Sequence, residues 1–187
     1  RVSTALIIGG GICGLTTAIA LARKGIAVQV FEQASRLKEV GAGLTVWHNG
    51  MYALNEIGLD SAVIKCGQVV ESFRFLDVHG KVLGAVDLDR LLRQTGQPAV
   101  TVHRKRLMEV LSAAAQNGIS IKTGHKFERY SQNEEGVTAY FQNGRTYKAD
   151  VLLGCDGFNS MVRKQLLKCR DKEERFYAGY TCFRGIA

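Results

Sequence analysis

The sequence predicts an α/β fold in which a parallel sheet is interrupted by antiparallel strands. Three observations support this prediction. An apolar strand at residues 5–8 runs into a glycine turn and a helix ending near Gly25, and a second apolar strand follows at residues 27–31. Segments with strand-like alternation and turn residues fill residues 119–149. An apolar strand with a second glycine turn, residues 151–157, then has the composition of a buried parallel strand.

The first glycine turn has the spacing of a dinucleotide-binding fingerprint. Gly9, Gly11 and Gly14 match G-x-G-x-x-G, where the first allows a tight turn, the second lets a pyrophosphate approach, and the third lets helix and strand pack closely. The helix N-terminus offers unpaired N–H groups and a positive dipole end to phosphate. Glu32 lies at about the spacing, roughly 20 residues, of the acid that binds ribose hydroxyls. These residues predict a Rossmann-like βαβ unit.

The same stretch is apolar enough for a signal peptide or a membrane span. Residues 2–22 carry no charge, and the segment Ala20-Leu21-Ala22 looks like a signal-peptidase site. Neither alternative requires three phased glycines or a second strand that ends in an acid. We therefore expect no integral membrane segment.

Length and composition are those of an ordinary globular chain. The 187 residues suit one domain or one domain with part of another, and 46% are hydrophobic. The formal net charge of +8 is scattered along the sequence, which favours a polyanionic dinucleotide over nucleic acid as the partner. The final residues, 185–187, lie inside an expected strand, so we expect a fragment of a longer protein. Oligomeric state stays open.

The cysteines indicate a reducing compartment. They are odd in number and form no C-x-x-C pair, which argues against a disulfide framework or a zinc site. We therefore expect no metal site, and a cytoplasmic location or a reducing organelle stroma. The five are Cys13, Cys66, Cys155, Cys169 and Cys182.

The middle of the chain interrupts the βαβ pattern. A glycine pair opens a short strand at 44–47, and two helices are expected next, one capped by Asn49 and ended by Gly58, the other capped by Asp60 and ended by Gly67. A hairpin with strands 69–76 and 81–86 then follows. We predict one domain from residues 1–67 and 99–187, and an excursion into a second layer over residues 68–98.

A second strand-turn-helix junction closes the fold. It is preceded by a helix from His103-Arg104 and by four strands expected to be antiparallel, at 119–123, 126–131, 137–141 and 146–149. The helix should bury Leu107, Val110, Leu111 and Ala114. At the junction, Asp156 has two interpretations: it holds ligand hydroxyls, or it caps the helix that begins at Asn159.

Taken together, these segments resemble the class A flavin-dependent monooxygenases, the para-hydroxybenzoate hydroxylase-like superfamily. The sequence GCDGFNSMVR at 154–163 resembles the family's DG motif, residues 40–59 its second segment, and residues 103–111 its flavin-binding arginine helix. The zeaxanthin epoxidase-like and FAD-dependent urate hydroxylase-like branches are closest in pattern. The resemblance implies a Rossmann-like FAD-binding domain interrupted by antiparallel strands of a partial substrate domain, with residues 68–98 as the excursion.

The resemblance also implies the reaction. NAD(P)H would reduce the flavin, O2 would add to form a flavin hydroperoxide, and an oxygen atom would pass to a small aromatic or unsaturated molecule. Two alternatives remain open: a flavin-dependent reductase of the geranylgeranyl reductase-like kind, or a fragment without activity of its own. The family's second flavin motif, a Gly-Asp segment, lies beyond residue 187.

A set of cofactor-binding positions carries over from the family, and no catalytic residue does. Gly9, Gly11, Cys13 and Gly14 would cradle the FAD pyrophosphate. Glu32 and Gln33 would bind the adenosine ribose, with Arg36 near the adenine or phosphates. On the flavin side, the set comprises Gly43, Thr45 and Arg104; Phe127 would offer backbone atoms to adenine, and Asp156 with Gly157 would serve FAD and the nicotinamide cofactor.

Two residues depart from the family pattern. Cys13 stands where glycine is usual, and His48 stands where proline is usual. We interpret Cys13 as a small buried filler and His48 as a loop histidine, although a histidine there could titrate near neutrality. His79 and His125 are expected on the solvated surface.

Overall fold

The computed structural model describes residues 1–37, 42–116, 118–168 and 177–181. The chain divides into two compact units, one made of Arg1–Glu39 with Leu111–Arg184 and the other of Val40–Val110. The first unit contains a parallel sheet, and the predicted α/β class is confirmed. The predicted boundaries of a substrate-domain excursion stay a prediction, because compactness does not say which residues would contact a substrate.

A four-stranded parallel sheet forms the centre of the first unit. Helix α1 (Ile12–Arg23) connects its first two strands, as predicted. One strand differs from expectation: the segment at residues 119–123 is parallel to its neighbour, not antiparallel. The chain enters that strand from helix α5 (Arg104–Ala115), and a helical connection can return the chain in the parallel direction. In spatial order the strands are β12 (Val151–Gly154), β1 (Thr4–Ile8), β2 (Ala27–Phe31) and β8 (Ser120–Lys122).

The apolar N-terminal stretch is divided between strand β1 and helix α1. The helix buries Leu15, Ala18 and Ile19, while β1 is buried on both faces. Across the described residues, every helix is too short or too polar to traverse a bilayer. Burial within a folded unit therefore accounts for the apolar character of residues 2–22.

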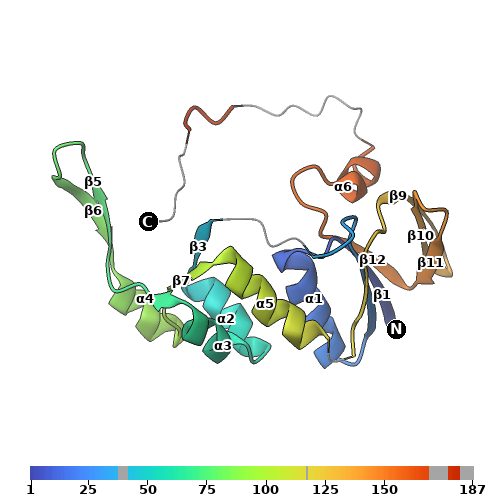
Figure 1. Cartoon of the computed structure of the whole chain (residues 1–187), viewed down its shortest axis with the longest axis horizontal. Helices are drawn as coiled ribbons and strands as arrows, with labels where there is room; N and C mark the ends of the chain where they lie inside the picture. The colour runs from blue at the N-terminus through green and yellow to red at the C-terminus, as the bar shows by residue number, and fades with distance from the viewer. Residues whose placement is uncertain (38–41, 117, 169–176, 182–187) are drawn as a thin grey trace. The chain divides into compact units, whose positions relative to one another are not determined.

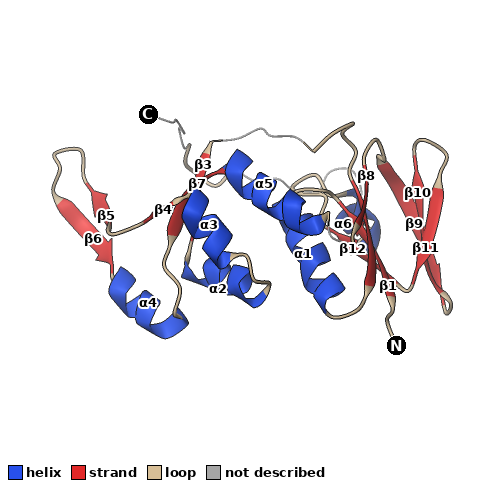
Figure 2. Cartoon of the chain, turned by 60° about the horizontal axis from the view of Figure 1, so that its bottom comes forward, coloured by secondary structure: helices blue, strands red, loops and turns tan. Residues whose placement is uncertain are grey.

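A three-stranded antiparallel sheet covers the face of the parallel sheet opposite α1, as Figures 1 and 2 show. Its strands are β9 (Phe127–Asn133), β10 (Gly136–Phe141) and β11 (Thr146–Ala149). The expected turns at 133–136 and 143–144 are present, with Gly136 and Gly144 at φ 131° and 77°, values that favour glycine. Helix α6 (Met161–Leu166) follows β12.

The core of the first unit lies between these two sheets. Leu6, Ile8 and Phe31 of the parallel sheet pack against a set of side chains from β9, β10 and α6. The rings of Phe31 and Phe141 are in contact, with centroids 4.6 Å apart and planes tilted by 33°. Alternate residues of β1 thus face the antiparallel sheet, as the two-residue period of a strand requires. The other members of the cluster are Phe127, Ala139, Phe141 and Val162.

The second unit contains a small antiparallel sheet, a hairpin, the first part of α5 and three further helices among the described residues. The sheet has the order β3 (Gly43–Val46), β7 (Val100–His103), β4 (Gln68–Val69). The helices are α2 (His48–Glu56), α3 (Asp60–Cys66) and α4 (Leu88–Thr95). The hairpin pairs β5 (Phe73–Leu76) with β6 (Val82–Val86), and Asp77 accepts the backbone N–H groups of its turn.

Several local predictions in the second unit were wrong. Helix α2 has Trp47, not Asn49, as its N-cap, and α3 has Leu59, not Asp60; neither cap makes a side-chain hydrogen bond. The first residues of the expected hairpin strand pair with β7 instead, as β4. Helix α4 was not predicted.

Helix α5 buries a face that differs by one position from the predicted one. Leu107 and Leu111 are buried as expected, but Met108 and Ala115 accompany them in place of Val110 and Ala114. A helix that repeats every 3.6 residues presents positions separated by four on nearly the same line. Residues 107, 111 and 115 form that line here.

Candidate functional site

A cavity of about 690 Å³ opens at the carboxyl edge of the parallel sheet. In the strand register, Ile8 lies opposite both Phe31 and Gly154, so the loops that leave these strands share one edge. Ligands of open parallel sheets bind at this edge, and the volume is in the range of small-molecule pockets. The lining residues are Ile8, Gly9, Gly11, Phe31, Glu32, Gln33, His125, Lys126, Phe127, Cys155, Asp156, Gly157, Asn159, Met161 and Lys164.

The structure thus brings seven predicted site residues to one cavity. They come from the loops after β1, β2 and β12 and from the start of β9. A second hollow of about 450 Å³ lies over strands β9 to β11, and no predicted site residue lines it. The seven are Gly9, Gly11, Glu32, Gln33, Phe127, Asp156 and Gly157.

Two glycines of the first turn are required by packing within the chain. Gly9 has φ 108°, and a Cβ there would lie 2.7 Å from the carbonyl carbon of Cys155. A Cβ on Gly14 would lie 3.0 Å from the carbonyl carbon of Gly9 and would overlap that carbonyl's oxygen. These are the tight turn and the close helix–strand contact that the sequence predicted.

Gly11 differs from the other two because nothing in the described chain requires a glycine there. Its φ of −81° and ψ of −172° suit any residue, and a Cβ would meet no described atom within 4 Å. The residue is the N-cap of α1 and lines the cavity. The space beside Gly11 is therefore free for a group that approaches the backbone closely.

The N-terminus of α1 presents backbone donors at this position. The first turn contains no acidic side chain, and no side chain of the described residues caps it. Leu15 makes the first intrahelical bond, to Gly11 O at 2.9 Å, which leaves the N–H groups of the preceding residues without helical acceptors. Together with the free space beside Gly11, these donors suit a phosphate group.

Glu32 is fixed at the cavity by two backbone amides. Its Oε2 accepts from Gly10 N at 2.9 Å and its Oε1 accepts from Ala34 N at 2.8 Å. Each carboxylate oxygen can accept a further bond. The acid is therefore held at the end of β2 with acceptor capacity left for hydroxyl groups.

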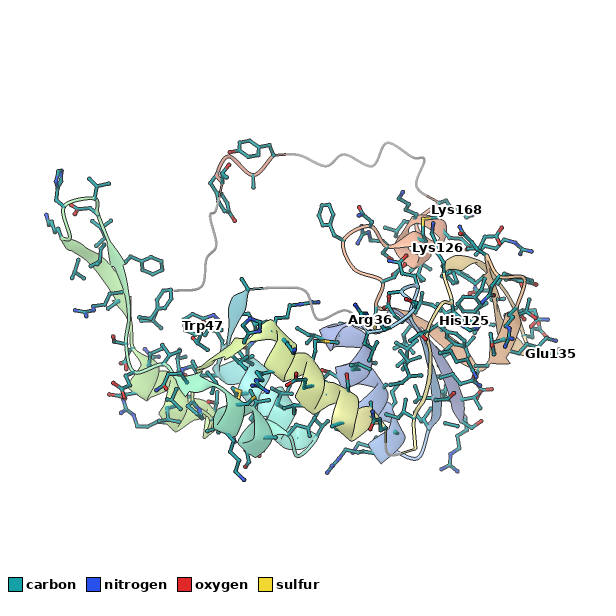
Figure 3. The ribbon with its side chains drawn as sticks, in the orientation of Figure 1. Arg36, Trp47, His125, Lys126, Glu135 and Lys168 are labelled. Atoms are coloured by element: carbon teal, nitrogen blue, oxygen red, sulfur yellow. The ribbon has the colours of Figure 1, made fainter. Side chains whose placement is uncertain are left out.

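The loop between β8 and β9 contributes His125 and Lys126, which the sequence analysis did not place in the site (Figure 3). His125 is half-buried: its Nδ1 donates to Thr123 O at 2.8 Å, and its Nε2 lies 3.2 Å from the hydroxyl of Tyr147. The expectation of a solvated surface histidine was therefore wrong. Lys126 adds a positive charge to the lining. Only the tertiary arrangement brings this loop to the sheet edge, so no local sequence signal identifies it.

Asp156 makes the contacts of a helix cap. Its Oδ1 accepts from Ser160 Oγ at 2.5 Å, and its Oδ2 accepts from Met161 N at 2.7 Å. Ser160 is the N-cap of α6, so the helix begins two residues later than expected. Gly157 has φ 79°, which favours glycine. The contacts expected of a helix cap are thus observed, and the role of Asp156 in holding ligand hydroxyls stays a prediction.

Cys13 is exposed in the first turn of α1, so the expectation of a buried filler was wrong. Its Sγ lies 3.6 Å from the Sγ of Cys155, a residue of the cavity lining. Burial is the main cause that raises the pKa of the Cys155 thiol to about 11, and the neighbouring Cys13 adds to it. Two free thiols therefore lie side by side at the edge of the cavity.

The remaining predicted positions lie outside the cavity lining. Arg36 is exposed in the loop after β2 (Figure 3). Gly43 and Thr45 are on β3 and Arg104 begins α5, all within the second unit. Thr45 Oγ1 lies 3.0 Å from Thr101 Oγ1. The cofactor roles of these residues stay predictions.

His48 is not a loop histidine, contrary to expectation. It begins α2 and is buried, and its Nδ1 donates to Gln97 O at 2.6 Å. Its Nε2 is buried without a hydrogen-bond partner in the described part of the chain. His79 is exposed, as expected.

Known proteins share this architecture. The chain is 37% identical over 183 residues to an aurachin C monooxygenase/isomerase from Stigmatella aurantiaca, an alignment that covers 98% of this chain and 47% of that protein. It is 34% identical over 185 residues to an FAD-dependent urate hydroxylase from Mycolicibacterium vanbaalenii, covering 97% and 46%. A solved structure of HpxO from Klebsiella pneumoniae, complexed with FAD and uric acid, superposes with a TM-score of 0.75 at 28% identity, covering 87% and 41%.

The chain spans about half the length of the curated relatives it matches. A family model described as the FAD binding domain matches residues 2–181. The resemblance to flavin-dependent monooxygenases, predicted from the glycine fingerprint, the DG segment and the arginine helix, is confirmed. The chain belongs to the FAD-binding domain family.

Proposed function

We propose that this chain is the FAD-binding part of an FAD- and NAD(P)H-dependent monooxygenase that hydroxylates or epoxidises a small aromatic or unsaturated molecule. The observation that carries the proposal is the free space beside Gly11, at the N-terminus of α1 and on the wall of the cavity. The names of its relatives, a monooxygenase/isomerase and a urate hydroxylase, support the reaction class.

Different residues of the cavity would bind different parts of the adenosine half of FAD. The N–H groups at the start of α1 would bind the pyrophosphate, and the absence of a Cβ at Gly11 would let it approach. The oriented carboxylate of Glu32 would accept the ribose hydroxyls. Lys126 and Lys164 would add favourable charge, because both line the cavity and the pyrophosphate is anionic.

Residues outside the cavity would bind the flavin half of FAD. Gly43, Thr45 and Arg104 would serve the flavin side of FAD, as the family pattern implies. FAD supplies the redox chemistry when bound, and this chain orients it and shields it from water. We also propose that the protein works in a reducing compartment, since its cysteines are odd in number and include no C-x-x-C pair.

A spectroscopic experiment tests the cofactor. The purified chain is incubated with FAD and desalted, and its visible absorption spectrum is recorded beside a circular dichroism spectrum that reports folding. We expect the flavin bands to remain with the folded chain, and ADP in excess to displace them. A folded chain that elutes colourless would show that this part does not hold FAD without the rest of the protein.

An oxygen electrode tests the reaction class. With FAD bound, NADH and NADPH are each added and oxygen consumption is followed. A monooxygenase consumes O2 as NAD(P)H is oxidised, whereas a flavin-dependent reductase need not. Oxidation of NAD(P)H without oxygen consumption would therefore refute the monooxygenase proposal while leaving FAD binding intact.

A further inference from the structure

Two thiols meet where the loops after β1 and β12 leave the sheet. The strands are paired, with Ile8 opposite Gly154, so Cys155 directly follows one strand end and Cys13 lies in the helix after the other. Cys13 Sγ and Cys155 Sγ are 3.6 Å apart, although 142 positions separate the residues in the chain. Both cysteines are free.

The two sulfurs differ in accessibility. Cys13 is exposed, whereas Cys155 is half-buried and lines the cavity. Burial raises the pKa of the Cys155 thiol to about 11, which keeps this sulfur protonated near neutral pH. A reagent in solution therefore reaches Cys13 first, and Cys155 is the sulfur placed to react next.

Cys66, the third cysteine in the described ranges, has different surroundings. It lies in the second unit, where its Sγ donates to Val63 O at 3.5 Å. Burial is the main cause that raises the pKa of its thiol. Cys66 thus provides a matched control for a thiol that lacks a described thiol neighbour.

We propose that Cys13 and Cys155 form a reversible dithiol–disulfide site at the edge of the cavity, oxidised by a small-molecule disulfide such as glutathione disulfide. The sulfurs are 3.6 Å apart and must approach to a bond length of about 2.05 Å for the disulfide to form. The proposal concerns the thiols alone and does not depend on FAD binding.

The exchange proceeds in two balanced steps. The Cys13 thiolate attacks one sulfur of glutathione disulfide, whose S–S bond breaks and releases one glutathione thiolate. The Cys155 sulfur gives up its proton and attacks Cys13 in the mixed disulfide, which releases the second glutathione. Two cysteine thiols are oxidised, one glutathione disulfide is reduced, and the two protons pass to the released glutathione thiolates.

Peptide mapping tests this site in the wild-type chain. The folded chain is equilibrated in buffers with increasing ratios of oxidised to reduced glutathione, quenched in acid, blocked with N-ethylmaleimide and digested with trypsin. Trypsin releases Cys13 on residues 2–23 and Cys155 on residues 149–163, and each of the other three cysteines on a peptide of its own. We expect a cross-linked pair of peptides 2–23 and 149–163 that grows with the ratio and disappears under reductant.

Three serine variants assign the roles of the sulfurs. C66S should form the cross-link to the same extent as wild type. C155S should accumulate glutathione on Cys13, because the resolving sulfur is missing, whereas C13S should carry at least tenfold less glutathione on Cys155. Equal labelling of the two single variants would refute the assigned order of attack.

Two results would overturn the site itself. One is the absence of the 2–23/149–163 pair in folded wild-type chain at every glutathione ratio. The other is a yield of that pair in the folded chain no greater than in urea-unfolded chain, where the five cysteines combine without guidance from the fold. Because both measurements use the wild-type chain, a variant that fails to fold does not affect them.

Discussion

Replacing Gly11 by alanine tests whether the glycine at this position is needed for ligand binding or for packing within the chain. The new methyl group would meet no described atom within 4 Å, and the backbone already has φ −81° and ψ −172°. Alanine lowers the entropy of the unfolded chain, which stabilises by about 0.4–1 kcal/mol, and it is a poorer N-cap by a similar amount. We therefore expect the free energy of unfolding to change by less than about 1 kcal/mol.

The same change should weaken FAD binding strongly. The methyl group would occupy the space through which the pyrophosphate approaches the start of α1. Loss of one hydrogen bond to a charged group corresponds to about 1.5–3 kcal/mol, or roughly a 10- to 150-fold higher Kd for FAD. Fluorescence titration of FAD measures the affinity, and urea denaturation without FAD measures the stability.

Gly14→Ala is the matched control. Its Cβ would lie 3.0 Å from the carbonyl carbon of Gly9, which is backbone and cannot rotate away. Overpacking of about 1–3 kcal/mol exceeds the helix-propensity gain of about 1 kcal/mol that alanine brings. We expect a lower Tm for this variant even without FAD. If Gly11→Ala loses as much stability as Gly14→Ala, or keeps wild-type FAD affinity, the assignment of ligand space beside Gly11 is wrong.

Three further changes probe the core, the sheet edge and the second turn. Phe141→Ala removes a ring that is 2% exposed, and urea denaturation should show a loss of about 3–5 kcal/mol. Asp150→Asn should lower Tm, because the backbone N–H groups of Ser3 and Thr4 hold the pKa of Asp150 below its usual range. The stabilisation by the Asp150 carboxylate is complete above the ordinary pKa of about 3.9, and it is lost as the pH falls through the lower pKa of the folded chain. The difference in Tm between Asp150→Asn and wild type should therefore shrink below about pH 4. A difference that grows in acid would contradict this. Asp156→Ala should lower the free energy of unfolding by about 0.5–2 kcal/mol through the lost cap, and unchanged FAD affinity in that variant would limit Asp156 to capping.

The parts of the fold that were predicted correctly have strong local signals. Strand β2 runs from Ala27 to Phe31, as expected, because four of its five residues are apolar and a turn glycine, Gly25, precedes it. The roles of Gly9 and Gly14 were also predictable, since only a missing side chain allows those contacts. Both junctions at the cavity could therefore be located from the sequence.

The parts that were missed depend on tertiary contacts or on helix ends. The parallel direction of β8 follows from where α5 returns the chain, and the position of His125 follows from that strand. Helix α4 did have a signal: Asp87 caps it by accepting from Arg90 N at 2.8 Å, and Gly96 ends it with φ 68°. Leu88, Leu91 and Leu92 also have the i, i+3, i+4 spacing of an apolar helix face, but the helix is only 8 residues long, so the pattern covers little more than two turns.

The pairing of β1 with β12 also determines how long β1 lacks one of its neighbours while the chain is being synthesised. The carboxylate that anchors β1, on Asp150, is 147 positions after Ser3, and ribosomes add about 5–20 residues per second. The N-terminal strand therefore waits about 7 to 30 seconds for the neighbour that completes its side of the sheet. Residues 40–110 emerge within that interval as one continuous segment and can fold first. Until β12 arrives, one edge of the apolar β1 is unpaired, and an unpaired strand edge favours contacts with chaperones and with other nascent chains.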